Sequence, residues 1–229
     1  MYVIIYSRLD SKRLKNKVLT KLFNGKTLVE QVICEAKKIT SNNKIILATT
    51  NKKRDNKLCD IAIKNKINYF KGSENNVLER TIECCKKFKI DKFLRYCGDR
   101  PFIMTEEIKR YLGKDLTNID MITTNSLEKK IDKGLTFEII NVKSLDKIYN
   151  NIKLTKFDKE HLTNFFYKNN KNFKIKTIKY SSCFYKGYNY SIDDKNDLKL
   201  INFFLEKKFN EKKNFKQIVK LYEKFATFN

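Results

Sequence analysis

Polar side chains that could bind phosphate follow the first apolar segment of the chain. Residues 2–6 form a short β-prone run, and four such side chains come directly after it: Arg8, Ser11, Arg13 and Lys17. A strand that presents fixed cations at its carboxyl end is a common way for an α/β fold to bind a phosphate chain. No glycine precedes Gly25, so this is not a glycine-rich P-loop and side chains must do more of the binding. On this segment alone, a solvated basic turn explains the pattern equally well.

Aspartates follow two later apolar segments in the same way. Asp99 comes after the run at residues 92–97 and lies between a flexible Gly98 and a stiff Pro101. Asp193 ends a short apolar run and stands at the start of an expected helix. Mg²⁺ takes one or two carboxylates and completes its shell with phosphate and water, so either aspartate suits it. The alternative is that each aspartate only caps the helix that follows.

Alternating strands and helices must position these residues. Over the first half, apolar runs indicate strands at 2–6, 44–50, 68–71 and 92–97, and helical periodicity indicates helices at 27–36, 55–65, 77–88 and 104–112. This alternation predicts right-handed βαβ units, and hence an α/β fold with a mainly parallel sheet and helices on both faces. In such sheets ligands bind at the carboxyl ends of the strands, where the polar side chains described above fall.

The second half of the chain is less regular. We expect strands at 120–124, 136–142, 173–179 and 188–192, and helices at 158–169, after Asp194 and at 215–225. The sequence has no internal repeat and no linker-like segment. It therefore predicts a single domain over 1–229, with about 125–185 forming a small inserted lobe for acceptor binding or dimerisation.

The net charge of +24 suggests an anionic partner. Lysine, asparagine and isoleucine are all abundant while a single proline is present, which is typical of coding bias acting on the whole sequence. The lysines are scattered, so a solvated basic surface is the better interpretation than a specific nucleic-acid patch. The charge still favours a polyanionic small ligand such as a nucleoside triphosphate.

Other classes of protein are disfavoured by composition. The 41% hydrophobic content suffices for a sizeable core, and no apolar stretch approaches the roughly 20 residues of a membrane span. The N-terminus lacks the long apolar region of a signal peptide. Six cysteines without C-x-x-C spacing and one histidine argue against a zinc site. We expect reduced thiols, a cytoplasmic protein and no membrane partner.

Four groups of residues occur in the order and spacing of one known family. They are Arg8…Ser11…Arg13-Leu14…Lys17-Val18-Leu19, then Lys71-Gly72-Ser73-Glu74…Val77-Leu78…Arg80, then Arg95…Gly98-Asp99…Pro101, and Asp193…Asp197-Leu198. The chain resembles the cytidylyltransferases of bacterial surface-polysaccharide synthesis, of the spore coat polysaccharide biosynthesis protein F type, which are similar to the enzymes that make CMP-sialic acid and CMP-Kdo. The match is dense over 1–103 and resumes near 134–138, 160–163 and 190–201.

The resemblance implies a nucleotide-diphospho-sugar transferase (Rossmann-like) fold, CTP as donor, Mg²⁺ as cofactor, an acidic sugar as acceptor, release of pyrophosphate and a possible homodimer. By position, it implies nucleotide binding by Arg8, Ser11, Arg13, Lys17, Ser73 and Arg80. It implies metal binding by Asp99 and Asp193, and binding of the second substrate by Arg95, Glu138 and His161. Among these, Arg13, Lys17 and Asp99 are the expected catalytic residues.

This sequence departs from the family pattern in the loop after the first strand. Asp10 stands where glycine is common, and an acid there is unfavourable for a triphosphate unless it points away. Two alternatives stay open: a nucleotidyltransferase of the same fold that uses another triphosphate or a sugar phosphate, and a non-enzymatic basic module that binds nucleic acid. The second leaves the placement of Asp99 and Asp193 unexplained. His161 is a candidate general base, although a lone histidine is more often a surface or packing residue.

Overall fold

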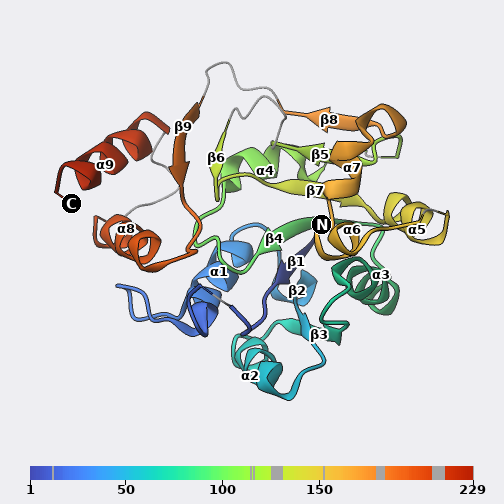
Figure 1. The fold of residues 1–229 in the computed structure, drawn as a ribbon, viewed down its shortest axis with the longest axis horizontal. Coiled ribbons are helices and arrows are strands. Elements are labelled where there is room, and N and C mark those ends of the chain that lie inside the picture. The colour runs from blue at the N-terminus through green and yellow to red at the C-terminus, as the bar shows by residue number, and fades with distance from the viewer. Residues whose placement is uncertain are drawn as a thin grey trace.

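The computed structural model describes residues 1–11, 13–113, 115, 117–124, 131–151, 153–178, 184–207 and 215–228. Its main sheet has seven strands in the order β3-β2-β1-β4-β7-β5-β8 (Figure 1). These strands are β1 (Tyr2–Tyr6), β2 (Ile45–Thr50), β3 (Asn68–Gly72), β4 (Lys92–Cys97), β5 (Met121–Thr123), β7 (Glu138–Asn141) and β8 (Ile175–Thr177). All neighbouring pairs are parallel except those that β7 makes with β4 and β5. The expected α/β fold with a mainly parallel sheet is confirmed.

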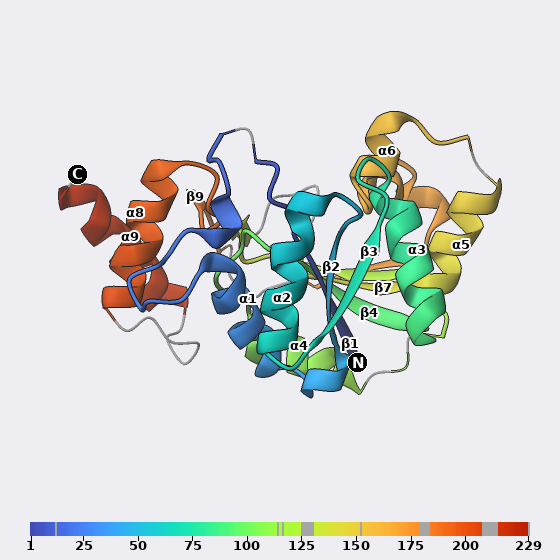
Figure 2. The same cartoon turned by 90° about the horizontal axis from the view of Figure 1, so that it is seen from below.

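Helices cover both faces of the sheet because the strands are apolar on both faces. Along β1, Val3 and Ile5 belong to one buried cluster, whereas Ile4 belongs to another, as alternation along a strand requires. The first cluster takes in α1 (Leu28–Lys37), α2 (Asn56–Lys64), α4 (Thr105–Leu112), α8 (Lys195–Glu206) and α9 (Phe215–Phe228). The second takes in α3 (Val77–Phe88), α5 (Val142–Asn151) and α7 (Asn164–Lys168), with α6 (Lys156–Glu160) beside α3. Figure 2 shows α1 and α2 on one side of the strands and α3 and α5 on the other.

Local signals place most elements of the first half. The capping box at the start of α1 is present, since Thr27 and Glu30 bond to each other's backbone amides. The expected ranges of α3 and β4 match the structure at both ends. Short 3₁₀ turns connect several elements: Lys17–Leu19, Asn42–Lys44, Lys53–Asp55 and Asn170–Asn172.

Three expectations for the second half are wrong. The expected helix at 158–169 is two helices, because α6 ends at Glu160 and α7 begins only at Asn164. The expected strand at 188–192 ends earlier, since β9 spans Phe184–Asn189. Neither α5 nor β6 (Ile131–Lys133) was expected. The helix α5 begins directly after β7, at the β-branched residue Val142. The apolar run of the strand therefore continues into the helix, and the sequence does not mark where the helix begins.

The range 125–185 does not lie wholly beside the main sheet. It supplies β7 and β8 to that sheet, and β6 with β9 forms a separate two-stranded parallel sheet. Residues 125–130 and 179–183 of this range lie outside the described residues. A role of this range in acceptor binding or dimerisation stays a prediction. In the described part of the chain, no helix has the length and apolar character needed to cross a membrane.

Candidate active site

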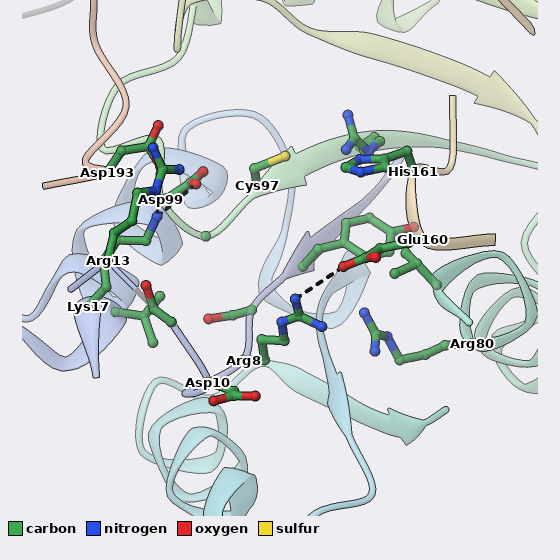
Figure 3. Close-up of a pocket in the computed structure, with 17 residues that line it drawn as sticks. Arg8, Asp10, Arg13, Lys17, Arg80, Cys97, Asp99, Glu160, His161 and Asp193 are labelled. Atoms are coloured by element: carbon green, nitrogen blue, oxygen red, sulfur yellow. Dashed lines mark hydrogen bonds and ion pairs between the residues drawn. The ribbon is translucent and has the colours of Figure 1, made fainter. Parts of the chain in front are cut away.

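A cavity of about 590 Å³ opens at the carboxyl ends of β1 and β4. It is lined by all the predicted site residues except Ser73 and Glu138: Arg8, Ser11, Arg13, Lys17, Arg80, Arg95, Asp99, His161 and Asp193. Figure 3 shows two groups among the labelled residues, with Arg13, Lys17, Asp99 and Asp193 on one side and Arg80, Glu160 and His161 on the other. The topology thus brings residues from five separate segments to one edge of the sheet.

The loop that carries Asp99 lies directly against the end of β1. The amide of Gly98 donates to the carbonyl of Tyr6 at 2.8 Å, which extends the pairing of β1 with β4. A Cβ at position 98 would lie 2.9 Å from both the Ser7 side chain and the Tyr6 carbonyl. Only glycine allows this approach, and it sets Asp99 beside the basic loop that follows β1.

A buried carboxylate that sequence analysis missed fixes the start of that basic loop. Asp55 accepts a hydrogen bond from the Leu9 amide at 2.9 Å and another from the Thr50 hydroxyl, and its side chain is fully buried. The neighbouring Asp10 forms an ion pair with Arg54 at 3.3 Å. Asp10 nevertheless lines the cavity, and Arg54 also pairs with Glu74, so the ion pair with Arg54 offsets the charge of Asp10 only in part.

Asp99 and Asp193 lie close together, and Lys17 stands between them. The Lys17 ammonium nitrogen is 3.1 Å from Asp99 Oδ2 and 3.2 Å from Asp193 Oδ1. The backbone reinforces this arrangement, since the amide of Ile192 donates to the Asp99 carbonyl at 2.9 Å. Arg13 also contacts Asp193 Oδ1, at 2.9 Å. Two of the predicted phosphate-binding cations thus lie on the predicted metal ligands in this structure.

Neither aspartate is occupied in capping a helix. Asp194 caps α8 by accepting from the amides of Asn196 and Asp197, and Asp197 in turn accepts from the amide of Asp193 at 2.7 Å. The helix that follows Asp99 is α4, which has no side-chain cap. The capping alternative for the side chains of Asp99 and Asp193 is therefore wrong.

The Asp193 carboxylate is charged despite being 7% exposed. Burial on its own would raise the pKa of Asp193, but the hydrogen bond from Lys133 and the charge of Lys17 outweigh it and hold the pKa below its ordinary value. Lys133 was not expected at the site. It approaches from β6, a strand that the sequence did not indicate.

Near the second group of residues, Glu138 forms an ion pair with Arg95 and does not itself line the cavity. The two side chains form an ion pair of 2.7 Å between adjacent strands, and Tyr167 donates to the second oxygen of Glu138 at 2.6 Å. Burial would raise the pKa of Glu138, yet the Arg95 charge and the Tyr167 hydrogen bond hold it below its ordinary value. Glu138 does not line the cavity, whereas Arg95 does.

Ser73 likewise does not line the cavity but contacts a predicted site residue that does, Arg80. Its carbonyl accepts a hydrogen bond of 2.7 Å from Arg80, and its hydroxyl accepts from the amide of Asn76. Arg80 is 4% exposed, and its Nε has no hydrogen-bond partner among the described residues. Arg80 itself lines the cavity, whereas its Nε is shielded from solvent.

Eight further residues line the cavity without having been predicted as site residues, and Ser7, Cys97 and Glu160 are among them. Glu160 forms an ion pair of 3.3 Å with Arg8 (Figure 3). His161 is exposed and lines the cavity where α6 ends, and its ring lies 4.1 Å from that of Phe157. The break between α6 and α7 thus occurs at the segment that faces the cavity, and the motif around positions 160–163 was the available signal for Glu160.

The sequence profile of the cytidylyltransferase family matches residues 2–226. The chain belongs to the cytidylyltransferase family. It is 37% identical over 175 residues to an uncharacterized protein of Methanocaldococcus jannaschii, covering 75% of this chain and 69% of that protein. It is 25% identical over 214 residues to the spore coat polysaccharide biosynthesis protein SpsF of Bacillus subtilis, covering 89% and 85% of the two chains. Family membership makes the chain a CTP-dependent nucleotidyltransferase, and the non-enzymatic alternative is wrong.

Solved structures support the fold of this cytidylyltransferase. A cytidylyltransferase from Leptospira borgpetersenii superimposes with a TM-score of 0.88 at 21% identity, covering 99% of this chain and 94% of that one. A CMP:2-keto-3-deoxy-manno-octonic acid synthetase in complex with CTP gives a TM-score of 0.67 at 13% identity, covering 91% and 99%. At these identities the likeness concerns the fold.

The donor set of this cytidylyltransferase fits Mg²⁺. The described residues contain no group of three histidine, cysteine or acidic side chains that could enclose a metal ion on their own. They do contain the Asp99 and Asp193 pair, whose nearest oxygens share the Lys17 ammonium as a common neighbour. Two carboxylates with the remaining ligands supplied by phosphate and water are the usual magnesium environment in enzymes that act on nucleotides.

Proposed function

We propose that this cytidylyltransferase transfers CMP from CTP to an acidic sugar with release of pyrophosphate, in a Mg²⁺-dependent reaction that serves surface-polysaccharide synthesis. The observation that carries the proposal is the pair of carboxylates, Asp99 and Asp193, bridged by the Lys17 ammonium. A cation already occupies the position between two acids, beside an arginine that is 67% exposed and can reorient. Such a site suits a metal–triphosphate complex.

The chain's own cations would stabilise the leaving pyrophosphate. In-line attack by an acceptor hydroxyl forms a new oxygen–phosphorus bond at the α-phosphate and breaks the bond to the bridging oxygen of the β-phosphate. The hydroxyl proton passes to solvent, and negative charge grows on the oxygen that departs with pyrophosphate. Arg13 and Lys17 are carried by one loop and are the groups that can follow that charge, since their present partners are carboxylates that a metal would take over. When bound, Mg²⁺ would be held by Asp99 and Asp193 and would neutralise phosphate oxygens.

The remaining part of the cavity suits an acidic acceptor. Arg95 lines the cavity with 20% of its side chain exposed, and its ion pair with Glu138 holds it in place. Arg80 adds a buried guanidinium to the cavity lining, held by its hydrogen bond to the Ser73 carbonyl. Fixed guanidinium groups in a partly closed cavity favour a carboxylate over a neutral hydroxyl. The name of one structural neighbour, a synthetase of CMP-2-keto-3-deoxy-manno-octonic acid, supports an acidic sugar as acceptor, and the name of the Bacillus subtilis relative supports a role in polysaccharide synthesis.

The test is pyrophosphate release with each nucleoside triphosphate and a panel of acceptors. We expect turnover with CTP, Mg²⁺ and a keto-deoxy or nonulosonic sugar acid, and little with the same sugar reduced to a neutral alcohol. The Asp99→Asn variant is the control for background hydrolysis. Turnover that requires a sugar phosphate, or that prefers UTP, GTP or ATP, would overturn the assignment of the acceptor or of the donor. We place the reaction in the cytoplasm, as the reduced thiols expected from the sequence suggest, and a homodimer stays a prediction.

A further inference from the structure

Lys133 contacts the predicted metal ligand Asp193 from a part of the fold that no motif indicated. Its ammonium lies 2.5 Å from Asp193 Oδ2, whereas Arg13 and Lys17 both contact the other oxygen, Oδ1. We propose that Lys133 is a positioning residue that holds Oδ2 and thereby presents Oδ1 of Asp193 to the metal ion. This inference rests on the proposed metal-dependent function.

The fold places Lys133 beside Asp193 through a close contact of two backbones. The amide of Tyr190 donates to the Lys133 carbonyl at 2.8 Å as β6 pairs with β9. The next residue, Gly134, has a φ of +93°, and a Cβ there would lie 2.4 Å from the Tyr190 backbone. Only glycine lets the chain turn at this point while it lies against the segment that leads to Asp193. The backbone of Lys133 is therefore fixed beside the segment that carries Asp193.

The two oxygens of Asp193 face different surroundings. Oδ1 is the oxygen that shares Lys17 with Asp99, so it lies on the side where one ion could reach both carboxylates. Arg13 and Lys17 come from the loop that follows β1 and can move to a bound triphosphate. Lys133 does not line the cavity, so it stays on Oδ2 when the other two cations leave. A ligating carboxylate whose second oxygen is hydrogen-bonded keeps its orientation, and loss of such a partner costs metal affinity.

The charge of Lys133, taken alone, would weaken metal binding, which is opposite to the effect expected from its hydrogen bond to Asp193. Removal of a positive charge near a metal site favours a divalent ion, because like charges repel. The Lys133 side chain is 57% exposed, however, so solvent screens its charge strongly. Orientation of the carboxylate acts through a direct hydrogen bond at 2.5 Å, which salt and solvent weaken less than they weaken a longer-range charge effect. We therefore expect the loss of Lys133 to weaken metal binding.

The experiment compares Lys133→Met, which keeps the length of the side chain but not its donor, with Lys133→Arg, which keeps a donor. Binding of Mn²⁺ to the protein in the presence of CTP and without acceptor is followed by the loss of the free-ion EPR signal. For Lys133→Met we expect the Mn²⁺ dissociation constant to rise about 10- to 100-fold. The Mg²⁺ concentration for half-maximal turnover should rise in parallel, while KM for CTP at saturating Mg²⁺ stays within about twofold. Lys133→Arg should restore most of the metal affinity.

Lys57→Met serves as the matched control, because Lys57 is an exposed lysine of α2 away from the cavity. Unchanged or tighter Mn²⁺ binding by Lys133→Met would overturn the proposal, and a rise in KM for CTP alone would show that Lys133 binds the nucleotide instead. A melting temperature close to that of the parent protein separates a local effect from misfolding, and if Lys133→Met fails to fold, the Lys133→Leu variant, which also lacks a donor, takes its place. If the parent protein itself binds no Mn²⁺ with CTP and releases no pyrophosphate, the proposed function fails rather than this inference alone.

Discussion

Arg95 and Glu138 stand opposite each other on the antiparallel strands β4 and β7 and form a buried ion pair of 2.7 Å. Their register is set by the backbone ladder, so the pair links the sheet directly to a wall of the cavity. Arg95 reaches the cavity, whereas Glu138 is 6% exposed and also accepts from Tyr167. Glu138, which was predicted to bind the second substrate, therefore fixes the orientation of Arg95, another residue with the same predicted role.

The Glu138→Gln variant should lose stability as well as function. It leaves the Arg95 charge without a counter-ion in a largely buried position, and breaking such a pair from one side costs about 3 kcal/mol. Urea denaturation gives the free energy of unfolding. A loss below about 0.5 kcal/mol would show that solvent already screens the pair.

Stability should also depend on pH through the same carboxylate. The pKa of Glu138 is lowered in the folded protein from its ordinary value of 4.5. Its contribution is therefore fully present above about pH 4.5, declines below it, and is gone once the pH falls below the folded-state pKa. In melting curves between about pH 6 and pH 3, Glu138→Gln should show a flatter decline than the parent protein. The decline should not vanish, because Asp193 and Asp158 also have lowered pKa values. Parallel curves for the two proteins would contradict the assignment.

Asp99→Asn should reduce turnover roughly a hundredfold or more with the fold intact, because it removes a predicted metal ligand. Asp193→Asn should do the same. Since ligands of one ion act as a unit, the double variant should lose little more than either single variant. Steady-state rates of pyrophosphate release at several Mg²⁺ concentrations provide the measurement. Losses that multiply in the double variant would indicate that the two aspartates act separately.

Arg13→Ala should weaken binding of CTP more than binding of CMP. Arg13 is 67% exposed and forms an ion pair with Asp193, so it can move to the distal phosphates, which CMP lacks. Isothermal titration with each nucleotide in the presence of Mg²⁺ measures both affinities. Equal losses for CMP and CTP would place Arg13 away from the β- and γ-phosphates.

Lys17→Met should have opposite effects on metal binding and on turnover. The Lys17 ammonium occupies the position between Asp99 and Asp193, so the protein without nucleotide carries its own cation where the metal is expected. Removing it should tighten Mn²⁺ binding to the nucleotide-free protein by on the order of tenfold, because two carboxylates lose a competing charge. Turnover should fall, since a cation for the leaving pyrophosphate is lost. Weaker Mn²⁺ binding in this variant would contradict the competition.

Local patterns predicted the elements that carry the nucleotide end of the site. Apolar runs placed β1 to β4, and helical periodicity with a capping box placed α1 to α3. Those signals are local, because burial on a strand or on a helix face recurs with a short period along the chain. Helical periodicity failed at residues 158–169. There α6 ends at Glu160 at the edge of the cavity, three residues follow, and α7 begins at Asn164.

By itself the sequence determined the fold class, the family and most of the predicted residues that line the cavity, because spacing after β1 and β4 fixes which side chains of those segments reach the carboxyl edge of the sheet. Tertiary structure decided what these side chains contact there. It placed Lys17 between Asp99 and Asp193, gave Glu138 to Arg95 and brought Lys133 to Asp193. These partners are far apart in the chain, and their contacts depend on how whole elements pack and in which register the strands pair. No local pattern carries that information.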